Sequence, residues 1–397
     1  MYRQCEKLII KSKAIATKYD NHLQLLELLN WENKLIGALE FQKKEIIPME
    51  SNYRNIYSIL DQYRNCQKYE YLLFKFRFIG LKVGGHRSHK DIALREKIIN
   101  HPLFGSEDKA LSFSAKIYFY ICHIGFLSAK GDHINSKLYS EKEIKLIESN
   151  FHQAEENPRI YIRALNGLII NLSKLNKYDE ALSAINTMEN LSMLPSSLKL
   201  KTLIQTYNMK INICLATGAF EKGLELIQND TVYQQYKDKN SLDLLLIYNI
   251  SYIYLGNGDF ANANIWLNRI INDDTTLRPD LQCFSRILSL IVHFELGKDG
   301  SLEYAIKSTY SFLYKKKGLF KVESAILDFL ENKIAKIKSN KDLIAAFRAL
   351  RAELIKISKI AYEKRAFDYF DFISWLTSKI ENRSFAKVVQ EKLALNS

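Results

Sequence analysis

Histidines offer the first chance of metal chemistry in this chain. The densest group is GGHRSHK, which contains His86 and His89, with His101 twelve residues further on. Imidazole nitrogens bind zinc, but no cysteine or carboxylate completes a recognised ligand spacing here. His293 and Glu295 form HFE, half of a zinc-deaminase motif whose PCxxC partner is absent. The sequence therefore predicts a polar loop for the first group, core packing for the second, and no metal.

A glycine pattern imitates a nucleotide-binding loop. In YLGNGDFANA, Gly256, Gly258 and Ala261 follow an apolar run, as in the GxGxxA fingerprint of dinucleotide-binding folds. The same loop recurs four times elsewhere without the glycine pair, so Gly258 is predicted to end a helix. No GxSxG, HExxH or GxxxxGK[ST] motif occurs in the chain. We therefore expect no enzymatic activity, no catalytic residue and no cofactor.

Basic side chains are the third chemical feature. The chain holds 57 Lys+Arg against 44 Asp+Glu, a net charge of +13, and the excess lies in residues 1–100 and 301–397. Clusters occur at Lys315, Lys316, Lys317 and Lys321, and at Lys75, Arg77, Lys82, Arg87 and Lys90. Either cluster could contact nucleic-acid phosphates. The alternative is solvated helix ends, where positive charge is favourable with the helix dipole.

The elements that must position these residues are set by an internal repeat. Five ten-residue segments align without gaps, and their starts are 40 to 45 residues apart. They begin at Gly131, Asn176, Gly218, Gly258 and Gly300. Glycine and asparagine tolerate the left-handed conformation that ends a helix. The first column of the repeat therefore predicts five helix stops.

A second column of the repeat contains only small residues. Its members are Ser136, Ala181, Gly223, Ala263 and Ala305. A small side chain at a fixed position allows one helix backbone to cross closely over another. The column therefore predicts a steric contact between the two helices of each unit.

The segments around each stop predict an all-α protein. A helix-length apolar segment precedes each stop, and a shorter amphipathic one follows. The five prolines fall between the predicted helices. Such helix pairs must stack, because none can bury its apolar face alone. Further helices are expected over residues 5–17 and 20–30, around KYD, and over 320–338, 342–361 and 365–382.

These units resemble the tetratricopeptide repeat (TPR). KYDEAL at Lys177–Leu182 and GDF...A at Gly258–Ala263 are similar to the turn and second helix of that repeat, over about residues 110–315. The stretches LRPDLQCFSRILSLIVHFELG and AFDYFDFISWLTSKIEN resemble uncharacterised TPR-type proteins of Bacteroidota. The resemblance implies an α-α superhelix, or solenoid, with helical caps at both ends. We expect a continuous solenoid with three regions: an N-terminal region 1–109 with one TPR-like pair, the array 110–317, and a C-terminal cap 318–397.

The inner wall of a TPR array is lined by residues of the first helix of each pair. By the alignment these are Arg163, Asn166, Gln205, Asn208, Asn212, Tyr248, Asn249 and Tyr252. Amide groups can hold a peptide backbone and tyrosine rings can bury a side chain. Alternatively, the asparagines bridge neighbouring repeats. Only Arg163 is cationic, so capture of a carboxylate tail is not expected.

These observations favour a non-enzymatic scaffold that binds a protein or peptide. A peptide-sensing regulator is the alternative, as in TPR-type quorum receptors, although no helix-turn-helix is evident. A nucleic-acid-associated factor that uses the basic ends is another.

The compartment expected is the cytoplasm. The five cysteines lie far apart without a CxxC pair, and charges interrupt every apolar run of MYRQCEKLIIKSK. Ala110–Ala129 is long enough to span a membrane, but Lys116 and His123 favour a buried helix.

Overall fold

Helices make up all the regular structure that is described for this chain. The computed structural model describes residues 2–40, 47–82, 89–229, 243–273, 278–297, 299–315, 320–333, 339–360 and 363–395. Within these ranges every element is helical, which confirms the all-α prediction. The chain divides into two compact units, residues 1–82 with 90–171 (unit 1) and 83–89 with 172–397 (unit 2). The three regions expected from the sequence stay a prediction.

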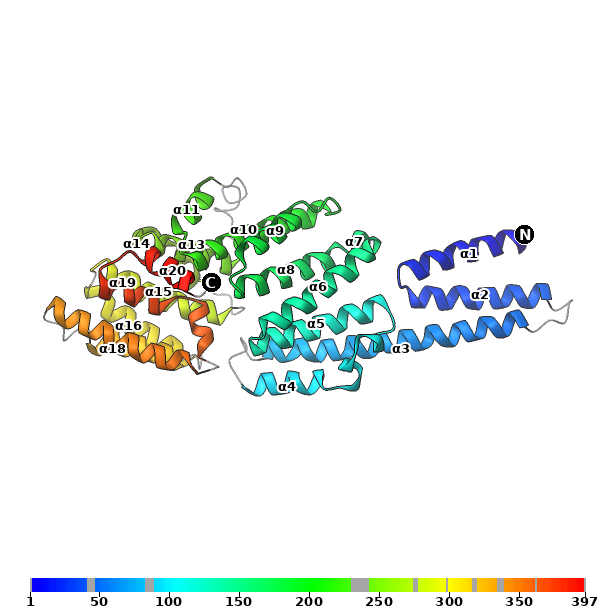
Figure 1. Cartoon of the computed structure of the whole chain (residues 1–397), viewed down its shortest axis with the longest axis horizontal. Helices are drawn as coiled ribbons and strands as arrows, with labels where there is room; N and C mark the ends of the chain where they lie inside the picture. The colour runs from blue at the N-terminus through cyan, green and yellow to red at the C-terminus, as the bar shows by residue number, and fades with distance from the viewer. Residues whose placement is uncertain are drawn as a thin grey trace. The chain divides into compact units, whose positions relative to one another are not determined.

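Unit 1 is built from helices that pack mainly on their neighbours in sequence. They are α1 (Tyr2–Lys18), α2 (His22–Glu40), α3 (Ile47–Lys82), α4 (His89–Ile99), α5 (Phe113–Lys130), α6 (His133–Ser149), α7 (Phe151–Glu156) and most of α8 (Pro158–Lys174). The long helix α3 packs on α2 and then on α5 (Figure 1). Its residues Tyr69 and Phe76 are buried with Phe104 and Phe119, which gives unit 1 a core.

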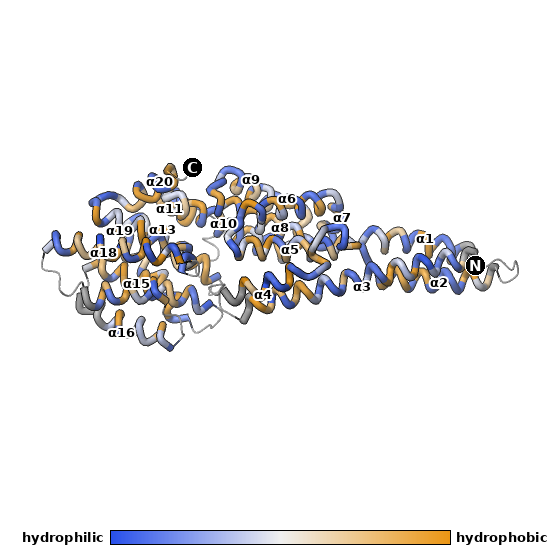
Figure 2. The backbone as a smooth tube through the Cα atoms, turned by 60° about the horizontal axis from the view of Figure 1, so that its bottom comes forward, coloured by the Kyte–Doolittle hydropathy of each residue, from blue (hydrophilic) through white to orange (hydrophobic). Residues whose placement is uncertain are grey.

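Unit 2 repeats this sequential packing. Its helices are α9 (Tyr178–Glu189), α10 (Ser196–Thr217), α11 (Phe220–Asn229), α13 (Leu244–Gly256), α14 (Phe260–Ile271), α15 (Pro279–Glu295), α16 (Asp299–Lys315), α17 (Lys321–Asp328), α18 (Asn340–Ser358), α19 (Phe372–Glu381) and α20 (Phe385–Leu395). Helix α13 packs on α10, α11, α14 and α15, and α20 returns to pack on α10. Hydrophobic and hydrophilic residues are interleaved along helices such as α2, α3 and α5 of unit 1, as amphipathic helices require (Figure 2).

Four of the five predicted helix stops are confirmed. Gly131, Asn176, Gly218 and Gly258 all have positive φ, between 59° and 82°. The fifth prediction is wrong, because Gly300 lies inside α16 and the positive φ of 64° falls on Gly297. A similar turn at Asp20, φ 56°, separates α1 from α2, as KYD predicted.

Four members of the small-residue column lie in tight packing, although at Gly223 the closest contact is with α13 of the next predicted pair and not with α10 of its own pair. Ser136, Ala181 and Ala263 are completely buried. A Cβ atom on Gly223 would approach Ile253 Cδ1 to 2.3 Å. Larger side chains at these positions would force the packed helices apart.

The C-terminal region departs from its prediction. The helix expected over 365–382 is interrupted: a 3-10 turn covers Lys364–Asp368, and α19 begins only at Phe372. Asp371 ends the interruption, because its Oδ1 accepts a hydrogen bond from Ser374 N at 3.1 Å and so caps α19. The irregular segment 369–371 contacts α13 through hydrogen bonds to Tyr248 and Tyr252.

Candidate functional site

Amide side chains of α10 and α13 meet in unit 2. Asn249 is buried, with 4% of its surface exposed. Its Nδ2 donates to Asn208 Oδ1 at 2.8 Å and to Asn212 Oδ1 at 3.1 Å. One buried amide of α13 therefore fixes the orientation of two amides on α10.

Gln205, Asn208 and Asn212 form one row on α10, here named the amide stripe. Their spacing of three and four residues places them on the same face of the helix. Gln205 and Asn208 are half-buried and Asn212 is exposed. Within the described part of the chain, the side-chain nitrogens of these three residues make no hydrogen bond. The stripe thus presents amide donors that the described residues of unit 2 do not use.

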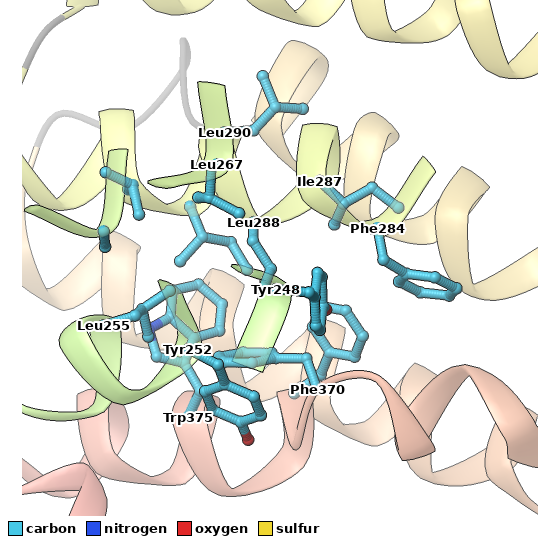
Figure 3. Packing of buried hydrophobic residues seen from close by; sticks show 14 of the residues in the cluster. Tyr248, Tyr252, Leu255, Leu267, Phe284, Ile287, Leu288, Leu290, Phe370 and Trp375 are labelled. Carbon is cyan, nitrogen blue, oxygen red and sulfur yellow. The ribbon is translucent and has the colours of Figure 1, made fainter. Parts of the chain in front are cut away.

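The two tyrosines expected on the same wall are not accessible. Tyr248 and Tyr252 are buried, with 2% and 7% of their surfaces exposed. Tyr248 donates its hydroxyl proton to Tyr369 O at 3.1 Å, and the ring of Tyr252 lies 4.8 Å from that of Phe370 (Figure 3). Burial raises the pKa of both hydroxyls well above the ordinary range. The expectation that they face a partner is wrong, because the C-terminal segment covers them.

In unit 1, Arg163 has a structural partner. Its Nη1 donates to Glu143 Oε2 at 3.2 Å, and its Nη2 donates to Glu143 Oε1. Glu143 is completely buried; burial raises the pKa of its carboxyl, and the Arg163 guanidinium opposes that rise. Asn166, one turn later on α8, is half-buried. The only cation among the expected groove residues therefore stabilises a buried carboxylate.

The basic patch is described in part. Lys315 and Lys321 are exposed, and Lys316 and Lys317 lie outside the described residues. In the second cluster, Lys75 lies over the ring of Tyr71, with its Nζ 4.3 Å from the ring centre. Binding of nucleic acid by either cluster stays a prediction.

Of the histidines singled out in the sequence, His101 has a described structural role. His86 lies outside the described residues, and His101 Nδ1 accepts from Leu103 N at 3.2 Å, which caps a short 3-10 helix. Glu295 of the HFE sequence accepts from Trp375 Nε1 at 2.9 Å and binds Lys379. Within the described ranges, no three His, Cys, Asp or Glu side chains are placed to hold a metal.

The glycine pair of YLGNGDF also has a structural reason. The segment before it is the helix α13 and not a strand, and Gly258 ends that helix with φ 78°. A Cβ on Gly256 would lie 2.5 Å from the Phe220 ring. The helix-stop interpretation is confirmed.

The sequence did not predict a cleft that lies between α17 and α18. Its volume is about 610 Å³, and Lys321, Asp328, Glu353 and Glu363 are among its lining residues. Glu363 is buried; its Oε1 accepts from Lys321 N at 3.0 Å, so it caps α17. No local motif signals this contact, because Glu363 lies 42 residues from Lys321.

Comparisons with known proteins do not assign the chain to a family. No protein-family model matches the chain, and no curated protein sequence matches it. Among the helices described, none is both long and apolar enough to cross a membrane.

Proposed function

We propose that the chain is a non-enzymatic, TPR-like superhelix of the cytoplasm that binds an extended segment of another protein along the amide stripe. The orientation of Asn208 and Asn212 by the buried Asn249 is the observation that carries this proposal. The resemblance of KYDEAL and GDF...A to TPR turns supports the superhelix. The free thiols of all five cysteines are in keeping with a reducing compartment.

The geometry of the stripe suits a peptide backbone. Seven residues separate Gln205 from Asn212, which is about 10 Å along a helix at ~1.5 Å per residue. An extended chain covers that distance in about three residues at ~3.3 Å each. The side-chain nitrogens of the stripe can donate to C=O groups of the peptide, and the Gln205 oxygen can accept from one of its N–H groups.

The stripe selects by shape and hydrogen bonding and not by charge. Gln205, Asn208 and Asn212 are neutral, and the nearby Lys210 is paired with Glu189 at 2.7 Å. Binding along the stripe should therefore change little with salt, because screening acts on charged pairs.

The test begins with affinity purification of the full chain and mass spectrometry of bound proteins. Synthetic peptides from the bound proteins are then titrated by calorimetry into wild type and the Gln205→Ala/Asn208→Ala variant. We expect a loss of about 1 to 3 kcal/mol, since each net hydrogen bond contributes ~0.5–1.5 kcal/mol. Asn268→Ala, an exposed asparagine on α14, is the matched control and should bind as wild type does. Equal binding by the stripe variant would disprove the proposal.

A further inference from the structure

Helix α3 carries a row of large side chains that unit 1 does not bury. The row follows the alternating spacing of four and three residues that defines a heptad pattern. We name it the open seam; it consists of Tyr53, Tyr57, Leu60, Arg64, Gln67, Tyr71, Phe74 and Phe78. Six of the eight are large and hydrophobic, and all six are exposed, with Phe74 at 66% and Tyr57 at 62%.

A second row on the same helix already fills the core of unit 1. Ile56 packs with Leu25 and Leu29 of α2, and Tyr69 and Phe76 pack with the α5 side of the unit. At ~100° per residue, Tyr69 and Phe76 lie about 160° around the helix from Tyr71, Phe74 and Phe78, on its opposite side. Helix α3 therefore has hydrophobic residues on two faces. One face packs against the rest of unit 1, and the other is the open seam. Hydrophobic residues recur along its whole length in Figure 2.

The rings of the open seam contact one another and leave their outer surface exposed. Phe74 and Phe78 stack at 6.3 Å, and Tyr53 and Tyr57 lie 6.4 Å apart. Contiguous exposed apolar surface of this kind marks interaction sites. Aromatic residues and arginine are also the residue types most enriched in the centres of protein interfaces.

The charges beside the open seam favour an acidic occupant. Its C-terminal half, from Gln67 to Phe78, contains or adjoins three cations, Lys68, Lys75 and Arg77, and Arg64 just before it is paired with Asp61 at 3.5 Å. The one carboxylate in this half, Glu70, already accepts a hydrogen bond from Gln67 at 2.9 Å. A second copy packed in parallel would place like charges opposite one another, whereas carboxylates on a partner helix would pair with these cations.

We propose that the open seam binds an amphipathic helix of another protein, with apolar residues at heptad spacing and Glu or Asp at the flanking positions. This goes beyond the proposed function, because the surface lies on unit 1 and takes a helix instead of an extended segment. From Tyr53 to Phe78 the seam is about 38 Å long at ~1.5 Å per residue. Arg64 and Gln67 stand at its middle, where polar residues fix the register of paired helices.

The experiment uses the full chain and a labelled synthetic helix of four heptads, with Leu at the a and d positions and Glu at e and g. The acidic flanks keep this peptide from pairing with itself. One control peptide carries Lys instead of Glu at e and g. The other has the composition of the acidic peptide with the spacing of its Leu residues scrambled. Fluorescence anisotropy at ~0.15 M salt, where the Debye length is ~8 Å, measures binding. We expect the acidic helix to bind and both controls to bind at least about tenfold more weakly.

Matched variants test the site itself. Phe74→Ala/Phe78→Ala should weaken binding at least about tenfold, as expected when interface aromatics are truncated. Ile134→Ala/Leu138→Ala, exposed at the same i, i+4 spacing on α6, should leave binding unchanged. Lys68→Glu/Lys75→Glu should reverse the preference toward the lysine peptide, and Lys142→Glu/Lys145→Glu on α6 should not. Thermal unfolding of every variant should match wild type, because all these side chains are exposed.

Four outcomes would overturn this proposal. The first is that the acidic helix binds no better than the lysine or scrambled control. The second is that the Phe74→Ala/Phe78→Ala variant binds the acidic helix as tightly as wild type does. Sedimentation reveals a dimer of the chain that this variant abolishes, which would make the seam a self-association surface. Alternatively, vesicles with anionic lipid or a single-stranded oligonucleotide bind through Phe74 and Phe78 while the acidic helix does not.

Discussion

The hydroxyl oxygen of Tyr252 accepts a hydrogen bond from the backbone N–H of Asp371, 119 residues further along the chain, at 3.1 Å. The neighbouring Phe370 is buried beside it. This contact joins α13, in the middle of the repeats, to the irregular segment before α19. It makes Tyr252 part of the core of unit 2.

Substitution of Tyr252 should therefore destabilise the fold. Tyr252→Ala removes a buried aromatic ring, and we expect a loss of about 3–5 kcal/mol in the free energy of unfolding, the range for large aromatic truncations. Tyr252→Phe keeps the ring and leaves the N–H of Asp371 without its acceptor, at a cost of about 1–3 kcal/mol. Urea unfolding followed by circular dichroism measures both. Unchanged stability of Tyr252→Ala would contradict the buried contact.

Enlarging the small-residue column should also destabilise the fold. Ala181→Leu and Ala263→Leu each add three carbons at a completely buried position, which should cost about 1–3 kcal/mol by overpacking. Ala216→Leu, on the exposed face of α10, is the control and should change the melting temperature little. If Ala263→Leu melts with wild type, the helix crossing at this position is not tight.

Acid should weaken the attachment of the C-terminal segment. The Asp280 carboxylate accepts hydrogen bonds from Arg278 and from the Tyr369 hydroxyl, the latter at 2.7 Å. Burial alone would raise the pKa of Asp280, but these bonds outweigh it and lower the pKa below the ordinary 3.8. A lowered folded pKa gives stability that is present above 3.8 and lost as the pH falls through the folded value. Asp280→Asn should be less stable than wild type near neutral pH, and thermal melts should show the difference shrinking below pH 3.8. A constant difference would argue against the ionised pair.

Thiol reactivity should distinguish Cys5 from the other cysteines. Cys5 is exposed, whereas Cys66, Cys122, Cys214 and Cys283 are buried. Burial raises the pKa of Cys66 to about 11 and that of Cys122 to about 12, so little thiolate forms at neutral pH. Ellman's reagent should titrate one thiol in the native chain and five in urea. Cys5→Ser should abolish the fast reaction, and a second fast thiol would show that one of the buried cysteines is accessible.

The sequence was sufficient to predict a helix end where glycine is the residue type that the backbone conformation requires. Gly131 and Gly218 end their helices because their left-handed conformation suits glycine. GKDG contains two glycines, Gly297 and Gly300. The alignment predicted the helix end at Gly300, but the positive φ lies at Gly297. The cap of α19 was missed, although Asp371 and Ser374 have the spacing of an N-cap.

Burial of the candidate site could not be predicted in the same way. Periodicity placed Tyr248 and Tyr252 on one helix face, but it carries no information about what covers that face. The covering segment is separated from Tyr252 by more than a hundred residues and contains no motif that points to α13. For Asn249, by contrast, the alternative of an asparagine that bridges neighbouring repeats describes the observed bonds to α10.

The return of the C-terminal segment to α13 also sets an order for folding during synthesis. At about 5–20 residues per second, a ribosome needs about 6–24 s to add the 119 residues between Tyr252 and Asp371. During that interval the buried face of α13 has no permanent cover on the nascent chain. In unit 1 the contact of similar span, between His152 Nε2 and Lys18 O over 134 residues, is exposed to solvent. We therefore expect chaperones to matter most while unit 2 is being synthesised, because its apolar face is then exposed.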